Sequence, residues 1–417
     1  MPDTWEWCRF GSYTLNRDNE RKPVSSVQRK KVKKIYDYYG ASGVIDQTDS
    51  FLFDEKLLLI GEDGANLLAR TKPIAFLADG KYWVNNHAHC IDSIDKRLLD
   101  FICVYINAIN LFQYITGSAQ PKLNQDNMNR ILMPIPPKAE QERILERIKI
   151  ILSNINDIDS LKGKLQSDIV NAKSRILDLA IRGKLVPQDP NDEPAAVLLE
   201  RIRTEKEELI KQGKIKRDKK ESVIFKGDDN SYYEKIGNDV TCIDDEIPFY
   251  IPDTWSWTRI STITDITMGS SPKSQDICND NRYIEFHQGK IYFSKKKLMK
   301  SNQYTRKTTK LASKQSVLLC VRAPVGELNI TDRDICIGRG LASIKSLGNI
   351  NEEFIFYWLH PYKTYLVNQS TGSTFSAITS DAVRKILIPL PPLMEQKKIL
   401  DKIQKVFALL ENLETVN

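Results

Sequence analysis

Two motifs occur twice in this chain, in the same order and about 250 residues apart. Pro2-Asp3-Thr4-Trp5-Glu6-Trp7 returns as Pro252-Asp253-Thr254-Trp255-Ser256-Trp257, and Arg130-Ile131-Leu132-Met133-Pro134-Ile135-Pro136-Pro137 returns as Lys385-Ile386-Leu387-Ile388-Pro389-Leu390-Pro391-Pro392. The offset is 250 for the first motif and 255 for the second, so the two halves are nearly equal in length. This period is too long for a solenoid repeat and indicates a duplicated domain with a connector. Such a layout suits a molecule that contacts two places on one extended ligand.

The composition limits the class of protein. With 417 residues, 41% hydrophobic and 28% charged, the chain has the make-up of a soluble globular protein with two to four domains. No apolar run approaches the ~20 residues that span a bilayer, and the N-terminus lacks a signal peptide. Seven scattered cysteines without C-x-x-C spacing favour reduced thiols. We therefore expect a cytoplasmic protein that makes no membrane contact.

Each half mixes strand and helix patterns, which predicts an α+β fold with two homologous domains. Short apolar runs such as Leu57–Ile60 are bounded by Gly and Asp turns, and a helical pattern covers Leu98–Phe112. The sequence predicts a first domain over 1–137, a central helix and a following helix over 138–212, an extended charged linker over 213–250, a second domain over 251–392, and a short C-terminal helix over 393–417.

The connector carries a heptad pattern. Apolar residues recur at a and d spacing for about five heptads, interrupted near Lys162 and Gly163, and paired prolines precede each helix. This seam needs a partner, and the second copy supplies one, so we predict an antiparallel coiled coil between the copies. The alternative is that each helix packs on its own domain. The predicted contact residues are Ile144, Ile148, Ile151, Ile155, Ile158, Leu165, Ile169, Ile176 and Leu179 with Ile399, Ile403, Val406, Leu410 and Leu413.

Basic residues cluster beside aromatic residues in both halves. The net charge of +7 is mild, so the distribution matters more than the total. Cations beside aromatic rings suit contacts with the phosphates and bases of nucleic acid. A solvated charged face is the alternative for either cluster. The clusters comprise Lys30, Lys31, Lys33 and Lys34, and then Lys295, Lys296, Lys297, Arg306 and Lys307.

The chain lacks the usual signatures of catalysis. It has no phosphate-binding glycine loop, no H-E-x-x-H and no G-x-S-x-G, and it holds four histidines. His87 and His89 share a spacing that permits metal ligation, but no third ligand is evident, so we predict no metal site. Loops rich in hydrogen-bond donors and acceptors favour a protein that binds and recognises a ligand over one that catalyses a reaction. Candidates for contact with nucleic-acid grooves are Asn86, His87, Arg322, Ser373 and Thr374; an ordinary hairpin turn is the alternative for the loop with Arg322.

With these motifs, the chain resembles the specificity subunit of type I restriction-modification enzymes over essentially its whole length. The resemblance rests on the two Trp motifs, on the Ile-Pro-Pro and Glu-Gln pattern before each helix, and on two further segments. One is Tyr39-Gly40-Ala41-Ser42-Gly43 with Trp83-Val84-Asn85-Asn86-His87-Ala88-His89, and the other is Gly183-Lys184-Leu185-Val186-Pro187-Gln188-Asp189-Pro190.

The resemblance implies two target-recognition domains, each reading one half of a bipartite, asymmetric site in double-stranded DNA. It implies that the helices dock two modification (methyltransferase) subunits, and that restriction subunits add translocation and cleavage. S-adenosylmethionine, ATP and Mg would then belong to those partners, with no cofactor and no catalytic residue in this chain.

One departure from the family pattern concerns the second helix, which lacks a segment matching Lys164 to Leu185. We expect one modification subunit to dock weakly if this helix cannot pair fully. Two other functions stay open at this point. The chain could be the DNA-reading part of a type II-like enzyme, or a non-enzymatic coiled-coil scaffold.

Overall fold

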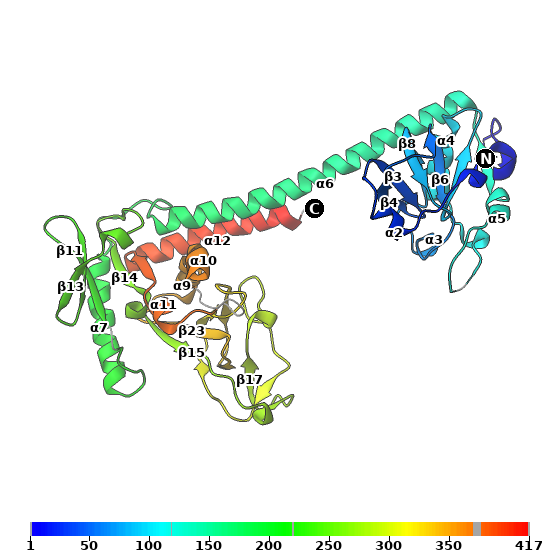
Figure 1. The fold of residues 1–417 in the computed structure, drawn as a ribbon. Helices are drawn as coiled ribbons and strands as arrows, with labels where there is room; N and C mark the ends of the chain where they lie inside the picture. The colour runs from blue at the N-terminus through cyan, green and yellow to red at the C-terminus, as the bar shows by residue number, and fades with distance from the viewer. Residues whose placement is uncertain (1, 118, 219–220, 370–376, 416–417) are drawn as a thin grey trace. The chain divides into compact units, whose positions relative to one another are not determined.

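The computed structural model describes residues 2–117, 119–218, 221–369 and 377–415, which form two compact units, residues 1–161 and 162–417 (Figure 1). Helix α6 (Lys138–Ile181) runs for 44 residues, so its first part belongs to one unit and its last part to the other. No helix among the described residues is both long enough and apolar enough to cross a membrane.

The first unit contains two four-stranded sheets and a strand pair that joins its two ends. The pair is β1 (Glu6–Arg9) with β10 (Leu132–Ile135). One sheet has the order β2-β9-β6-β7 and the other β4-β3-β8-β5. The bounds are β2 (Leu15–Asn16), β3 (Tyr36–Gly40), β4 (Gly43–Thr48), β5 (Phe53–Asp54), β6 (Leu57–Gly61), β7 (Ala75–Ala78), β8 (Lys81–Val84) and β9 (Ala88–Asp92).

Burial on both faces explains why β6 is uninterrupted apolar sequence. Leu58 and Ile60 pack in one core beneath α4 (Leu98–Ala108), whereas Leu57 and Leu59 point to a second core that contains Tyr82. Side chains alternate across a strand, so one central strand supplies both cores. The short helices are α1 (Phe10–Tyr13), α2 (Ser26–Arg29), α3 (Asn66–Ala69) and α5 (Gln125–Asn129).

The second unit repeats this pairing pattern and adds to it. Strand pair β14–β24 matches β1–β10, the sheet β15-β23-β20-β21 matches β2-β9-β6-β7, and a five-stranded sheet has the order β16-β18-β17-β22-β19. The bounds are β14 (Ser256–Arg259), β15 (Thr264–Met268), β16 (Ile277–Cys278), β17 (Ile284–His287), β18 (Tyr304–Thr305), β19 (Leu311–Ala312), β20 (Ser316–Cys320), β21 (Leu328–Thr331), β22 (Ile335–Ile337), β23 (Leu341–Ser346) and β24 (Leu387–Leu390).

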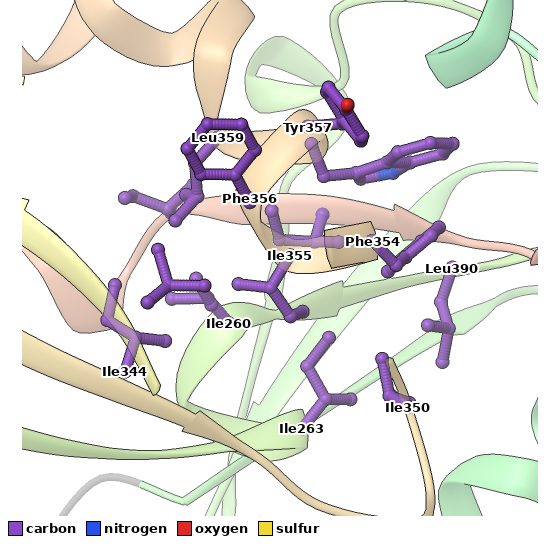
Figure 2. Close-up of a cluster of buried hydrophobic side chains, with 14 of the residues drawn as sticks. Ile260, Ile263, Ile344, Ile350, Phe354, Ile355, Phe356, Tyr357, Leu359 and Leu390 are labelled. Atoms are coloured by element: carbon purple, nitrogen blue, oxygen red, sulfur yellow. The ribbon is translucent and has the colours of Figure 1, made fainter. Parts of the chain in front are cut away.

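The main core of the second unit gathers around α9 (Glu352–Leu359), which is apolar and buried on every side from Phe354 onward. Figure 2 shows Phe354, Ile355 and Phe356 of this helix among isoleucines from α8 and β23 and Leu390 from β24. A helix that is hydrophobic all round belongs in a core, and Phe354 and Trp358 are fully buried here. The other helices are α7 (Ala195–Lys211), α8 (Ile260–Ile263), α10 (Lys363–Asn368), α11 (Ser380–Arg384) and α12 (Leu393–Thr415).

Within the second unit, the end of α6 lies antiparallel to α12 (Figure 1). Lys173 reaches Glu414 near the end of α12 at 3.3 Å, and Gln188, just after α6, reaches Glu395 in the first turn of α12 at 2.6 Å. Of the predicted seam, Ile169, Ile399 and Ile403 are buried, and Leu165, Ile176, Leu179, Val406 and Leu410 are half-buried. Ile144 and Ile148 are half-buried in the first unit, whereas Ile151, Ile155, Ile158 and Leu413 are exposed.

The prediction of an extended charged linker over 213–250 is wrong for its middle part. Strands β11 (Ser222–Lys226), β12 (Tyr232–Ile236) and β13 (Asp239–Cys242) form a three-stranded antiparallel sheet there. Asn230 and Gly237, at φ of 66° and 62°, allow the two tight turns of this sheet. The charges that suggested a solvated linker partly serve the fold, because Glu234 on β12 binds Arg259 on β14 at 2.7 Å.

Helix α7 is also part of the second core. Ala195, Leu198, Leu199 and Ile202 are buried in it, and a Cβ on Gly348 would lie only 2.3 Å from Cγ1 of Ile202. The side chain of Ile202 therefore occupies space that any residue other than glycine at 348 would fill. The segment after α6 folds together with the second domain.

We predict that Ile202→Ala destabilises the second unit by about 2–5 kcal/mol, because it leaves a cavity in a closed core. Val197→Ala on the same helix is the control, since Val197 is 45% exposed and should change stability by less than about 1 kcal/mol. Urea unfolding followed by circular dichroism measures both. Equal stability of the two variants would contradict the packing of α7 described here.

Candidate nucleic-acid interface

Each unit builds a groove from three loops at the end of one parallel strand pair. Strand β3 runs parallel to β8 in the first unit, and β17 runs parallel to β22 in the second. Parallel strands end at the same edge of a sheet, so the loops that follow them meet there. Two backbone hydrogen bonds recur in both units and show which loop positions are equivalent. The bond from Asn85 N to Tyr39 O in the first unit corresponds to the bond from Gly338 N to His287 O in the second. The bond from Glu62 N to His87 O likewise corresponds to the bond from Val321 N to Gly340 O.

In the first unit this groove has a volume of about 330 Å³. The β3–β4 turn, the loop after β6 and the β8–β9 loop contribute its walls. Gly61 allows the close approach, because a Cβ there would lie 2.5 Å from Ala41 O. The lining residues are Gly40, Ala41, Ser42, Ile45, Asp63, Gly64, Ala65, Asn66, Asn85 and His87.

The polar groups of the first groove hold one another in place. Nδ1 of His87 lies 2.8 Å from a carboxylate oxygen of Asp63, and His87 N donates to Oδ1 of Asn85 at 2.8 Å. Asn85 is buried, whereas His87 and Asn86 are exposed. The arrangement offers acceptors, an amide and an imidazole to a ligand, and it carries no excess of positive charge.

In the second unit the matching groove is smaller, about 220 Å³, and strongly cationic. Lys290, Arg322 and Arg339 line it and are all exposed, and its lining includes no carboxylate from the described part of the chain. Arg322 stands where the first unit has Asp63, and Arg339 stands where it has Asn86. Gly340 is required beside them, since a Cβ there would lie 2.2 Å from Gln288 O. This groove can bind an anion, or the hydrogen-bond acceptors of a base.

A partly buried ion-pair network anchors the strand that leads into the second groove. Glu285 on β17 accepts two hydrogen bonds from Arg333, at 2.6 and 2.7 Å, and one from the backbone N–H of Ser301 at 2.6 Å. Burial favours a higher pKa for this carboxyl, but these donors prevail and lower the pKa of Glu285 to about 2. Burial lowers the pKa of His287, so its neutral ring donates from Nε2 to Glu285.

A group of possible metal ligands in the first unit is already compensated by protein cations. Ligand atoms of Asp18, Glu62 and His89 lie within 4.8 Å of one another. Arg21 binds Glu62 at 2.7 Å and Asp18 at 3.3 Å, and Lys122 binds Glu62 at 3.1 Å. Nε2 of His89 lies 2.8 Å from Leu123 O and Nδ1 lies 2.5 Å from Asp18. These contacts make the group an internal ion-pair network that fastens β9 to its neighbours.

Comparison with known proteins shows the family. The family described as "Type I restriction modification DNA specificity domain" matches residues 2–166 and 252–417, one match in each half. The chain belongs to this family.

Curated relatives carry the same family name. A putative type I restriction enzyme specificity subunit (MjaX) from Methanocaldococcus jannaschii is 29% identical over 327 residues, covering 77% of this chain and 63% of the relative. The EcoAI specificity subunit of Escherichia coli is 23% identical, covering 72% and 58%. A putative specificity subunit from Haemophilus influenzae is 23% identical, covering 97% and 88%. The chain thus spans about six-tenths of the length of the first two relatives.

Solved structures share the fold of this specificity-domain chain. The HsdS subunit from Thermoanaerobacter tengcongensis superimposes with a TM-score of 0.58 at 19% identity, covering 100% of this chain and 93% of that one. A chain from a structural study of complex assembly and conformational transition of the type I R-M system gives 0.61, also at 19% identity with the same coverage. The predicted fold class, two homologous α+β domains with long helices, is confirmed at this level.

The predicted DNA-contact residues fall in different environments in this specificity-domain chain. Lys30, Lys31 and Lys33 are exposed and have no ion-pair partner among the described residues. Lys34 is tied to Asp46 at 2.6 Å, and the hydrogen bonds from Lys34 and Arg29 hold the pKa of Asp46 well below its usual range. In the second unit Lys295 contacts Glu414 at 3.3 Å, and Lys296 contacts Glu353 at 2.6 Å and lies over the ring of Tyr357. Lys297, Arg306 and Lys307 are exposed.

The two grooves collect only some of the predicted residues. His87 and Arg322 line them, and Asn86 lies in the loop between Asn85 and His87. Ser373 and Thr374 lie outside the described residues. Sequence reasoning missed Lys290 and Arg339. A signal for both exists, because each cation adjoins glycine next to an apolar strand, in Gly289-Lys290 and Gly338-Arg339-Gly340. The roles of all these residues in binding stay predictions.

We predict that Glu285→Gln makes the second unit less stable at pH 7 by about 2–3 kcal/mol. The stabilisation from ionised Glu285 is present above its ordinary pKa of 4.5 and is lost as the pH falls from there toward 2, because its folded pKa is depressed to about 2. Thermal unfolding measured from pH 7 to pH 2.5 should therefore show a shallower pH dependence in the variant. Parallel curves for the two proteins would show that the network contributes nothing to acid sensitivity.

Proposed function

We propose that this chain is the DNA-reading subunit of a type I restriction-modification assembly, and that it does no chemistry itself. The observation that carries this proposal is the pair of specificity-domain matches, each containing the same three-loop groove. The named relatives are specificity subunits of type I restriction enzymes, which supports the same function here. Methyl transfer with S-adenosylmethionine, and ATP- and Mg-dependent steps, would belong to modification and restriction subunits in the cytoplasm.

The grooves favour reading of two different sequences. Arginine pairs with two acceptors on guanine, and asparagine pairs with adenine, whereas a carboxylate accepts from cytosine. The second groove offers Arg322 and Arg339, and the first offers Asp63, Asn66 and His87. The same backbone with different side chains therefore suits a bipartite, asymmetric site. Lys30, Lys31 and Lys33, which are exposed, would contact phosphates beside the first groove and set its register on the duplex.

We predict that Arg322→Ala and Arg339→Ala each weaken binding to cognate DNA by about 1–3 kcal/mol if they contact bases, with relaxed specificity at one position. A cation that contacts only phosphate should instead lower affinity evenly and reduce the slope of log K against log salt by about 1. Fluorescence anisotropy at several salt concentrations separates the two cases. The control is Lys211→Ala, an exposed cation paired with Glu208 on α7. Wild-type affinity and slope in both arginine variants would remove this groove from the interface.

The function itself is tested by sequencing native DNA for methyladenine. Cells that express this chain with a type I methyltransferase subunit from the same organism are compared with cells that lack this chain. We expect a new motif of two short parts separated by a fixed gap, because two domains read two half-sites. If the methyltransferase is present, this chain is folded and no new motif appears, the proposed function fails.

A further inference from the structure

In the first unit, the ribbon formed by β6 and β9 continues past the ends of the two strands into the groove. Glu62 N donates to His87 O at 2.8 Å, one step beyond the last strand pair. Asp63 and Asn86 are next in this register, so they stand opposite each other on the ribbon. Asp63 also forms a backbone bridge with Lys122 on its other side. The backbone at position 63 is therefore held by a neighbour on each side.

The second unit builds the same frame with different side chains. Val321 N donates to Gly340 O at 2.9 Å, one step beyond the last pair of β20 and β23. Arg322 and Arg339 are next in this register and stand opposite each other. Arg322 also forms a bridge with Ala377, which follows its counterpart in the first unit by the 255 residues that separate the two Pro-Pro motifs. The two facing positions are therefore equivalent in both units.

The facing pair of the second unit consists of two like charges. Arg322 and Arg339 are exposed, and neither guanidinium has an acceptor within the described part of the chain. Lys290 adds a third positive charge to the same groove. Residues directly opposite on a ribbon have Cβ atoms about 5 Å apart, and like charges at this distance are destabilising. A ligand that supplies acceptors to both guanidiniums would relieve this repulsion.

The facing pair of the first unit presents a different set of groups. The carboxylate of Asp63 binds Nδ1 of His87 at 2.8 Å, whereas the amide of Asn86 is exposed. An amide offers a donor and an acceptor, which match N7 and N6 of adenine. A guanidinium offers donors alone, which match O6 and N7 of guanine. The same place on the backbone thus carries groups suited to different bases.

We propose that these facing pairs select the bases of each half-site, with Arg322 and Arg339 reading two adjacent G·C base pairs and Asn86 reading adenine in the other half-site. The base assignments rest on the proposed function and add to it which bases each domain selects. The major groove of DNA admits a two-stranded ribbon. The separation of about 5 Å between facing Cβ atoms is close to the ~3.4 Å spacing of neighbouring bases, so each guanidinium reaches a guanine of its own.

Sequencing of native DNA tests which bases are selected. The chain is expressed with a type I methyltransferase subunit from the same organism, and methyladenine in the genome of the cells shows the recognised motif. We expect two adjacent G·C pairs in one part of the motif. Arg339→Asn, which places the residue of the first unit in the second, should change one of these positions and leave the other part and the gap unchanged. The control is Arg201→Asn, an exposed arginine on α7 paired with Glu193, which should keep the motif of the unaltered chain.

Modified DNA tests the same contacts without altering the protein. In 7-deazaguanine the N7 acceptor is missing but base pairing is kept, so this base replaces each guanine of the recognised site in turn. Fluorescence anisotropy with the assembled chain and methyltransferase subunit should show about tenfold weaker binding at the two guanines that the arginines read, because a hydrogen bond to a charged donor is lost. Arg322→Lys should lose selection of guanine and keep the salt dependence of binding, because lysine keeps the charge but not the two-donor geometry.

Three results would overturn the proposal. One is a motif with no adjacent G·C pairs in either part. Another is 7-deazaguanine that weakens binding at no guanine, or equally at all of them. The third is an unchanged motif and unchanged affinity in Arg322→Lys, since this cation would then contact phosphate. If the unaltered chain gives no motif at all, the proposed function itself has failed, whereas a motif without the G·C pairs leaves that function standing and rejects only the base assignments.

Discussion

The antiparallel pairing of the first and last strands of each domain is the constraint on which the rest of the structure depends. It brings the entry and exit of the domain together, at β1–β10 in one unit and β14–β24 in the other. Proline ends the pairing because it donates no backbone hydrogen bond, and the long helix begins at once, at Lys138 and Leu393. A glutamine in the first turn of each helix then binds the carbonyl of the preceding proline. Everything between the two strands can vary without moving the point where the helix leaves the domain.

The grooves show what this freedom permits. Two backbone hydrogen bonds recur at matching positions in both units and hold the same three loops together. On that common frame, Asp63 with His87 is replaced by Arg322 with a glycine at position 340, so the charge of the groove changes from nearly balanced to strongly positive. Recognition by base contacts depends on a few side chains held by a rigid backbone. A duplicated domain can therefore diverge in specificity while its core is kept.

The sequence predicted what depends on local pattern and repetition. The doubled Trp and Pro-Pro motifs predicted two similar α+β domains. The heptad spacing predicted that the end of α6 and α12 would lie side by side, as the contact of Lys173 with Glu414 shows. The grooves could not be derived in this way, since parallel pairing joins β3 and β8 across some 40 residues. Arg339 was missed although Asn86, its counterpart, was chosen, because only the hydrogen-bond pattern aligns these loops. The sheet at 222–242 was missed because this segment is rich in charged residues, which suggested a solvated linker. Its ion-pair partner Arg259 lies outside the segment.

The lysine-rich run of the second unit explains why clusters in a sequence are an uncertain guide to a binding surface. Lys295 and Lys296 contact Glu414 on α12 and Glu353 on α9, and Lys296 also lies over Tyr357. A cation that already neutralises a carboxylate adds little net attraction for a polyanion, because both charges of the pair act on it at long range. Lys295 therefore links the second domain to α12, and Lys296 links its own loop to α9. Lys290, Arg322 and Arg339 are single residues scattered along the sequence, yet the fold places them in one groove, where none of the described lining residues is a carboxylate. Attraction to nucleic acid therefore depends more on whether each basic side chain is paired with a carboxylate in the folded chain than on how many lysines are close together in the sequence.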